Sequence, residues 1–290
     1  MPEKPQISIP QEIIDQFIDH LYDDQEALKM CALVCRAWVL STRYHLFGDV
    51  EIRVSTYNQI TGRFSALIGH LDHPLCTFAP SVRKLFISTS TKVSGPMPLY
   101  LPPNWADPLI PYLPKLISVT TLFAHEIGRP LYGWKPLFNS TPFVTQITHL
   151  SLNSPEFVTF EDCMATVHSF PSLEILEYIP HSLYDQGTLP SLPAFSGSPP
   201  PSLRTLHVES FSPNTQLIWQ WFHRSQTRLS VIKLGGLPLI STHDISAAKL
   251  SFFAQYLQFL GPSLEELHAG FQAAPTLCEF PVDRTLECIN

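Results

Sequence analysis

Charged residues are scarce in this chain, and their scarcity limits what kind of protein it is. Only 15% of its 290 residues are Asp, Glu, Lys or Arg, whereas an average soluble protein has about 25%. The few bases are spread out without forming a basic stripe, so the footprint of a nucleic-acid-binding protein is missing. Much of the chain is therefore expected to be buried or to contact other molecules.

Long hydrophobic runs and glycine-rich loops are missing as well. No stretch approaches the roughly 18 apolar residues of a membrane span, and the N-terminus lacks the apolar core of a signal peptide. We therefore expect no membrane association and a cytoplasmic or nuclear location. None of the 12 glycines forms a phosphate-binding loop, and the six cysteines are expected to stay reduced.

Motifs for catalysis and metal binding are not found either. The sequence has neither a G-x-S-x-G nucleophile elbow nor an H-E-x-x-H zinc motif. His70 and His73 lack a second ligand pair at zinc-finger spacing, and Cys31 and Cys35 fall inside an expected helix. Ser, His and Asp are too common to decide for or against a catalytic triad. We predict a non-enzymatic protein with no catalytic residue, cofactor or metal.

Proline, by contrast, is plentiful. It accounts for 28 of 290 residues, roughly twice its usual share of about 5%, which favours short elements. Residues 93–114 and 187–202 are especially Pro-rich and predict surface loops, the second of them extended and mobile. The second is interpreted either as a recognition loop or as a plain surface insertion.

Residues 9–47 have the pattern of a compact helical unit. Pro10 suits the first position of a helix, and apolar residues then recur at helical spacing over 13–21. The Asp23-Asp24 pair marks a turn and the N-cap of a second helix, which carries an apolar stripe over 28–39. So small a unit cannot bury a helix that is apolar nearly all round, so part of this surface is expected to meet a partner.

Blocks of this unit resemble the F-box. Residues 9–14 (IPQEII) resemble its Leu-Pro-x-Glu-hydrophobic opening, with Ile9 in place of the usual Leu. Residues 31–38 (CALVCRAW) resemble its hydrophobic-x-Val-Cys-(Arg/Lys)-x-Trp signature. Residues 45–50 (HLFGDV) resemble the exit of the motif in the large F-box families of fungi. The resemblance covers under a sixth of the chain.

The resemblance implies a substrate receptor of a cullin–RING ubiquitin ligase, docked on a Skp-type adaptor and through it on a cullin. By position, the adaptor-binding residues would be Pro10, Glu12, Ile13, Leu33, Val34 and Trp38. Trp38 suits an interface best, because large aromatic anchors carry much of the binding energy in a typical hot spot. The alternative is that these apolar residues form the unit's own core.

The rest of the chain repeats a short apolar pattern, in which an apolar residue is followed three positions later by Leu or Ile. Alternation within each run predicts a strand with one buried face, and the recurrence predicts stacked, parallel repeats joined by helices. The runs begin at Val82, Val119, Ile147, Leu173, Leu203, Leu229 and Leu264. Helices are expected over 214–222 and 250–260, the latter ended by Gly261 and Pro262.

This organisation resembles a degenerate leucine-rich repeat array. The repeats are longer than the usual 20–29 residues or so, and the Asn or Cys that bonds the loop backbone is missing, so apolar packing is expected to hold the turns. The resemblance implies an α/β fold: an N-terminal helical F-box-like segment, then an irregular leucine-rich-repeat-like solenoid with a parallel sheet and outer helices. We expect an F-box-like helical domain over 1–50, a helical connector over 51–78 and a leucine-rich-repeat-like domain over 79–290.

The expected function is that of a substrate-recognition subunit, which binds the adaptor through its N-terminal unit and an unknown target protein through its repeats. One alternative is a repeat scaffold that has no ubiquitin-ligase role. Another is a hydrolase or transferase, which would need a polar, convergent pocket.

Overall fold

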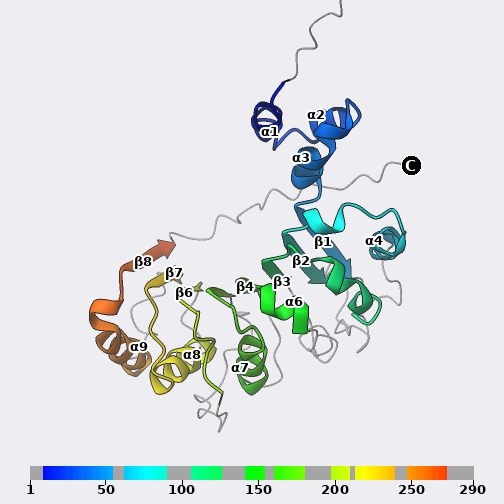
Figure 1. Ribbon diagram of the computed structural model, residues 1–290. Helices are drawn as coiled ribbons and strands as arrows, with labels where there is room; N and C mark the ends of the chain where they lie inside the picture. Colours follow the sequence, from blue (N-terminus) through cyan, green and yellow to red (C-terminus); the bar gives the residue numbers. More distant parts are fainter. Residues whose placement is uncertain are drawn as a thin grey trace, which may run out of the picture.

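The chain folds around one long parallel β-sheet (Figure 1). The structure is a computed structural model that describes residues 9–54, 62–89, 106–125, 141–153, 160–179, 197–209, 213–238 and 247–272. Within these ranges the strands are hydrogen-bonded in sequence order, each beside the next. They are β1 (Asp49–Val54), β2 (Lys84–Thr89), β3 (Thr121–His125), β4 (His149–Asn153), β5 (Ile175–Ile179), β6 (Thr205–Val208), β7 (Val231–Pro238) and β8 (Glu266–Gln272).

Helices precede the sheet and connect its strands. Those described are α1 (Gln11–Asp19), α2 (Gln25–Ala32), α3 (Arg36–Leu46), α4 (Gly62–Asp72), α6 (Thr141–Gln146), α7 (Phe160–His168), α8 (Pro213–Arg224) and α9 (Ala247–Leu260), with short 3-10 turns η1 (Ala79–Ser81), η2 (Ile110–Lys115) and η5 (Gly261–Ser263). Helices α7, α8 and α9 lie on one side of the sheet, whereas α1, α2 and α3 stand above β1 on the other (Figure 1). The α/β class expected from the sequence is confirmed.

All seven strands expected from the apolar runs are present. The run that starts at Val82 leads into β2 at Lys84, and the same offset of two residues holds for every later run. From Val82 to Leu229, the first residue of each run is buried in the turn before its strand. The apolar run therefore specifies both a strand and the anchored turn that leads into it.

The buried face of the sheet is a continuous row of aliphatic side chains. Its members lie beside one another in the strand register, and each is at most 1% exposed: Leu85, Leu122, Leu150, Leu176, Leu206 and Ile232. A second buried row runs parallel to it from Ile87 to Leu234. Since burying one such side chain is worth about 1.5–3 kcal/mol, the two rows form the core of the array.

A repeated backbone contact fixes the register at the start of every strand. The carbonyl before one strand accepts hydrogen bonds from two consecutive amides at the start of the next. Gly48 O accepts from the amides of Arg83 and Lys84, at 2.7 and 2.9 Å, and Arg83 O then accepts from those of Thr120 and Thr121. The pattern continues to Ser230 O, which accepts from the two amides that lead into β8. Each repeat is thus aligned by the one before it.

The N-terminal region departs from the sequence-based expectation in two places. The second helix was expected to continue past Cys35, but the chain breaks there into α2 and α3, because Cys35 is extended (φ −161°, ψ 167°) and caps α3. Residues 51–78 were expected to be a helical connector, but β1 occupies their start and α4 supplies a helix only from Gly62. The division into domains at residues 50 and 78 stays a prediction.

Three helix ends can be compared with what the sequence predicted. Pro10 lies one residue before α1, as its N-cap, and not at the first helical position that we expected. Asp24 caps α2 as expected, because its carboxylate accepts a hydrogen bond of 2.9 Å from the amide of Ala27. Gly261, with a φ of +47°, follows α9, where the left-handed backbone conformation favours glycine.

The two Pro-rich segments fall partly outside the described residues, which exclude 93–105 and 187–196. The described part of the first segment, residues 106–114, is not an open loop. It runs into η2, and its residues Leu109 and Leu113 are buried in the core. In the second, Pro199 and Pro200 are buried, and Trp221 on α8 donates a hydrogen bond of 2.9 Å to the Gly197 carbonyl. Residues 197–200 have no regular secondary structure, as expected of a loop, but Pro199 and Pro200 do not lie at the surface.

The N-terminal helices are joined to the sheet by a tight junction at Gly48. The Arg83 guanidinium lies 3.7 Å from the centre of the Tyr44 ring and donates a hydrogen bond of 2.7 Å to the Tyr44 hydroxyl. Nearby, the rings of Phe47 and Phe78 are 5.1 Å apart. A Cβ at Gly48 would lie 2.7 Å from Arg83 Nη2 and 2.8 Å from the Tyr44 carbonyl oxygen. The junction therefore has no room for a side chain at this position.

We predict that Gly48→Ala destabilises the protein by about 1–3 kcal/mol, because the new methyl group clashes with backbone and forces the junction apart. Gly69→Ala on α4 is the matched control, since nothing lies within 4 Å of its added Cβ. In a helix that change is expected to be neutral or stabilising by up to about 1 kcal/mol. Urea denaturation measures both; equal free energies of unfolding for the two variants would contradict the prediction.

Candidate functional site

The three N-terminal helices are held together by a row of polar contacts between α1 and α3. On α1, Gln11 donates a hydrogen bond of 3.2 Å to the Ala37 carbonyl, and Asp15 accepts one from the Ser41 hydroxyl. One turn further, Asp19 Oδ1 lies 2.8 Å from His45 Nε2. These positions recur every four residues on both helices, so one face of α1 meets one face of α3.

The core of this helical unit is small. Ile18, Leu28 and Thr42 are fully buried, and Cys31 is nearly so. The Thr42 hydroxyl is satisfied locally, since it donates to the carbonyls of Trp38 and Val39 on its own helix. With so few positions inside, most of the apolar side chains of the unit face solvent.

The six residues predicted to bind an adaptor lie on this solvent side of the helical unit. Pro10 and Glu12 are exposed at the start of α1. Ile13 is 54% exposed, and Leu33 and Val34, in the turn between α2 and α3, are 80% and 61% exposed. Trp38 on α3 is half-buried. The alternative that the whole set forms the internal core is therefore wrong.

Further exposed apolar residues were missed from the sequence. Ile13 and Phe17 are four residues apart on α1 and both are more than half exposed, so they form a ridge on one face of that helix, and Ile9, also exposed, precedes the helix. The Phe17 and Trp38 rings are 5.7 Å apart, which joins this ridge to α3. The helical spacing of Ile13 and Phe17 was part of the expected apolar pattern over 13–21, but the sequence did not show which of its members would be exposed. We call Ile9, Ile13, Phe17, Leu33, Val34 and Trp38 the apolar ridge.

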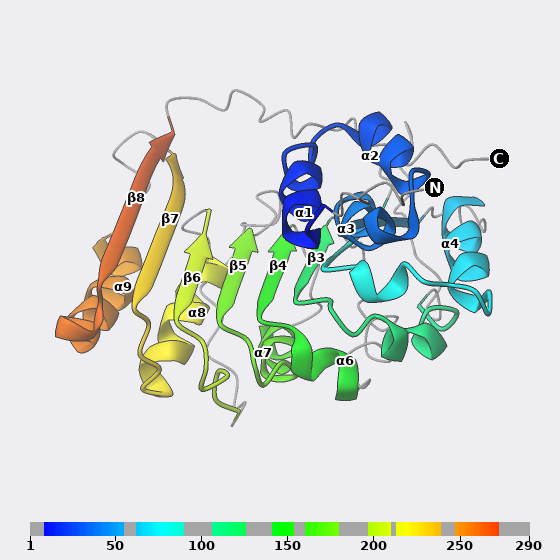
Figure 2. The same ribbon diagram turned by 45° about the horizontal axis from the view of Figure 1, so that its top comes forward.

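Figure 2 places the helical unit relative to the sheet. Helices α1, α2 and α3 lie near the tips of β3 and β4 in this view, on the opposite side of the picture from β7 and β8. Since the junction at Gly48 leaves no space for a side chain, we expect the unit to keep this orientation. The apolar ridge and the β8 end of the sheet are therefore separate surfaces of the molecule.

The sheet face opposite α7, α8 and α9 carries aromatic and charged side chains. Phe86 on β2 and Phe123 on β3 stack in parallel, with ring centroids 4.2 Å apart. On the next strands, Glu177 Oε1 lies 3.4 Å from His149 Nε2 and 3.8 Å from His207 Nδ1. His149 Nε2 is buried, and its contact with Glu177 does not have the geometry of a hydrogen bond.

The Glu177 carboxyl has a strongly lowered pKa. His149 holds its pKa well below the ordinary value, His207 adds to the effect, and partial burial opposes it. On the core side, burial raises the pKa of the Cys163 thiol far above its usual range. Cys163 is therefore a packing residue and not a reactive thiol.

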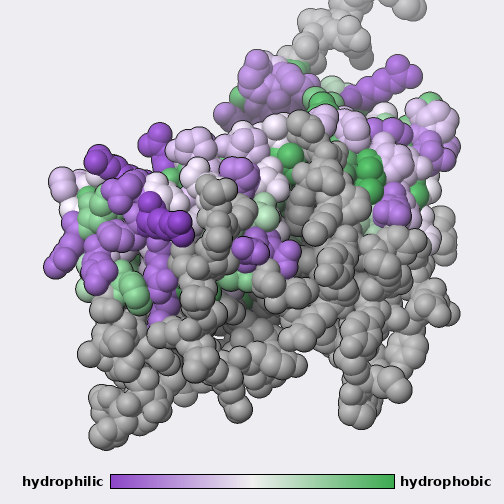
Figure 3. All heavy atoms as spheres, turned by 90° about the horizontal axis from the view of Figure 1, so that it is seen from below, coloured by the Kyte–Doolittle hydropathy of each residue, from purple (hydrophilic) through white to green (hydrophobic). Residues whose placement is uncertain are grey.

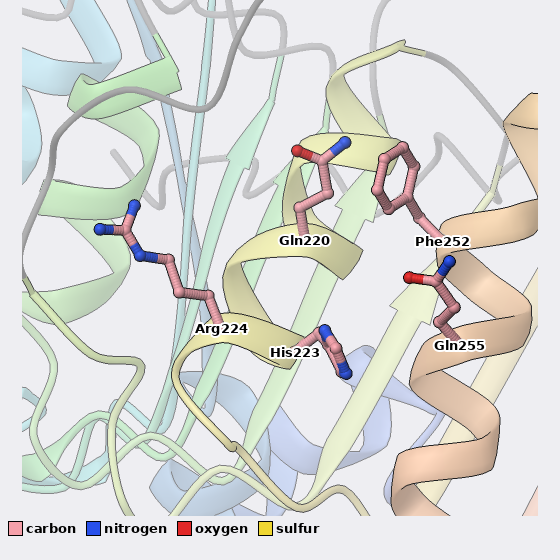
Figure 4. A pocket seen from close by; sticks show the side chains of 5 residues that line it. All are labelled: Gln220, His223, Arg224, Phe252 and Gln255. Carbon is pink, nitrogen blue, oxygen red and sulfur yellow. The ribbon is translucent and has the colours of Figure 1, made fainter.

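One shallow hollow lies between α8 and α9, with a volume of about 250 Å³. Gln220 and His223 enter it from α8 and Phe252 and Gln255 from α9, while the Arg224 side chain points away from them (Figure 4). This lining has no Ser, Cys or carboxylate next to the imidazole, so the hollow does not present the nucleophile and base of a hydrolase.

On the face seen from below, the coloured residues that are visible include small hydrophobic groups among mainly hydrophilic ones (Figure 3). No group of three or more His, Cys, Asp or Glu among the described residues is arranged to hold a metal ion. None of the described helices combines the length and apolarity needed to cross a bilayer.

A scan against protein-family models and a search of curated proteins found no match for the chain.

We predict that Glu177→Gln lowers the free energy of unfolding by about 1 kcal/mol near neutral pH. Folding lowers the pKa of this carboxyl. Its contribution to the free energy of unfolding is therefore present at a pH above its ordinary pKa of 4.5 and is lost as the pH falls. The difference from wild type should shrink between about pH 5 and about pH 2. Urea titrations across that range measure it. Glu174→Gln, at an exposed carboxyl before β5, is the control, and a pH-independent difference for Glu177→Gln would contradict the account.

Proposed function

We propose that this protein is the substrate-recognition subunit of a Skp-adaptor/cullin/RING ubiquitin ligase and is not itself an enzyme. In this proposal the N-terminal helical unit is an F-box that docks on the adaptor. The rest of the chain is a leucine-rich-repeat-like solenoid that binds target proteins, and ubiquitin transfer takes place on other subunits in the cytoplasm or nucleus.

The observation that carries the proposal is the exposure of the apolar ridge. A compact unit whose core is filled by Ile18, Leu28 and Cys31 still leaves Leu33 and Val34 among its most exposed residues. Several large apolar side chains exposed on one small unit are typical of a protein-interaction site. The F-box resemblance names four members of the ridge as adaptor contacts, from the sequence and without reference to their exposure: Ile13, Leu33, Val34 and Trp38.

The arrangement of the strands supports the second half of the proposal. Eight parallel strands follow one another in sequence order, with α7, α8 and α9 along one side, and their apolar positions recur every 26 to 37 residues. Stacked repeats that bury a continuous core are typical of solenoid proteins. The opposite sheet face, with Phe86, Phe123 and Glu177, is the surface that we assign to the target protein.

The adaptor-docking half is tested by a binding assay between the full chain and a purified Skp-type adaptor. We predict that Leu33→Asp together with Val34→Asp weakens binding by about 30-fold or more, equivalent to about 2 kcal/mol. Both side chains are exposed, so folding should be retained, as circular dichroism can verify. Leu75→Asp, at an exposed apolar residue after α4, is the control and should bind like wild type.

A second variant, Pro10→Ala with Trp38→Ala, tests the carried-over contacts at the other end of the motif. Adaptor binding that is unaffected by either double variant would refute the F-box assignment. Binding of the adaptor without co-purification of a cullin would favour the alternative, a repeat scaffold with no ubiquitin-ligase role.

A further inference from the structure

The first and last strands of the sheet differ in how far their apolar side chains are buried. At the first strand, Val50 and Ile52 are buried, and α4 packs on β1 with Phe64 and Leu71 in the same core. At the last strand, Leu267 continues the aliphatic row from Ile232, its register partner in β7. Ile232 is fully buried, but Leu267 is 48% exposed. Among the described residues, the apolar row is therefore covered at β1 and left open at β8.

The open end also has an unpaired backbone edge. β8 spans Glu266–Gln272 and pairs with β7 on one side, while no other described strand pairs with its outer side. Such an edge presents free N–H and C=O groups, a template for adding a further strand. Proline and lysine, which often protect exposed edges, do not occur within β8.

The side chains of β8 are complementary to those of a second copy of the same strand. Glu266 and His268 lie on one face, with Glu266 Oε2 2.9 Å from His268 Nε2, and Leu267 lies on the other. If two β8 strands pair in antiparallel fashion about Leu267, each Glu266 is opposite the His268 of the other copy. The two Leu267 side chains then meet on the apolar face.

Neighbouring registers lack this match. Pairing about Glu266 places the two Glu266 side chains opposite each other and sets Leu267 against Glu265. Pairing about His268 brings the two His268 side chains together and sets Leu267 against Ala269. Because opposed carboxylates destabilise a strand pair, whereas a carboxylate opposite an imidazole can accept a hydrogen bond from its N–H, the register about Leu267 is the favourable one.

We propose that the chain forms a twofold dimer through β8, paired in antiparallel fashion about Leu267, so that two sheets join into one. An interface of this symmetry is closed, because each copy uses its own β8 edge and leaves no β8 edge free for a third copy. The helical units lie at the opposite ends of the sheets (Figure 1), so the apolar ridge stays accessible. The inference does not depend on adaptor docking.

Light scattering coupled to size-exclusion chromatography of the full chain, over a range of concentrations, tests the dimer. Wild type is expected to be dimeric at the upper concentrations. Leu267→Asp places two carboxylates against each other at the centre of the interface and should raise the dissociation constant at least about tenfold. Ile117→Asp, at an exposed apolar residue far from β8 in sequence, is the control and should dimerise like wild type. A monomer at every concentration would overturn the proposal.

Exchanging the residues at positions 266 and 268 tests the register of the strand pair. Glu266→His alone sets histidine opposite histidine, and His268→Glu alone sets carboxylate opposite carboxylate, so each single change should weaken the dimer. The double exchange restores the opposite pairs with unchanged composition and should recover dimerisation. Because these side chains are exposed, folding should be kept, as circular dichroism can verify. Single variants that dimerise like wild type, or a double exchange without recovery, would overturn the pairing about Leu267.

Discussion

The structure depends on the alignment of each repeat by the one before it. Two consecutive amides at the start of a strand donate to a single carbonyl of the preceding repeat, from Gly48 to Ser230. This contact places the apolar positions of all strands in rows. A slip of one residue would turn those rows toward solvent. The register therefore holds the core together, even though the repeats differ in length.

The same alignment carries over to the N-terminal helices. The first carbonyl of this series is that of Gly48. The same residue is packed so closely between Tyr44 and Arg83 that no side chain would fit there. The helical unit is thus joined to the sheet through the first member of the backbone series, and not by a loose linker. In the proposed function, this close junction would hold the adaptor-docking helices in a set position relative to the sheet that binds the target.

Sequence alone predicted the repeated part of the fold well and the N-terminal region less well. The seven runs from Val82 to Leu264 gave the strands, because a buried row demands an apolar residue at the same place in every repeat. β1 was missed although Val50 and Ile52 alternate in it, since the segment was read as the exit of the helical motif. The break at Cys35 was missed because helical periodicity alone does not show where a backbone turns.

The candidate site was predictable as a set of residues but not as a surface. Whether Ile13 or Leu33 faces inward depends on how α1 crosses α3, which the polar contacts of Asp15 and Asp19 determine. Hydrogen–deuterium exchange of the full chain with and without a Skp-type adaptor tests the central claim most directly. The proposed function predicts added protection in residues 9–38 and unchanged exchange in β4 to β8. Protection confined to the sheet, or none in the helical unit at saturating adaptor, would contradict it.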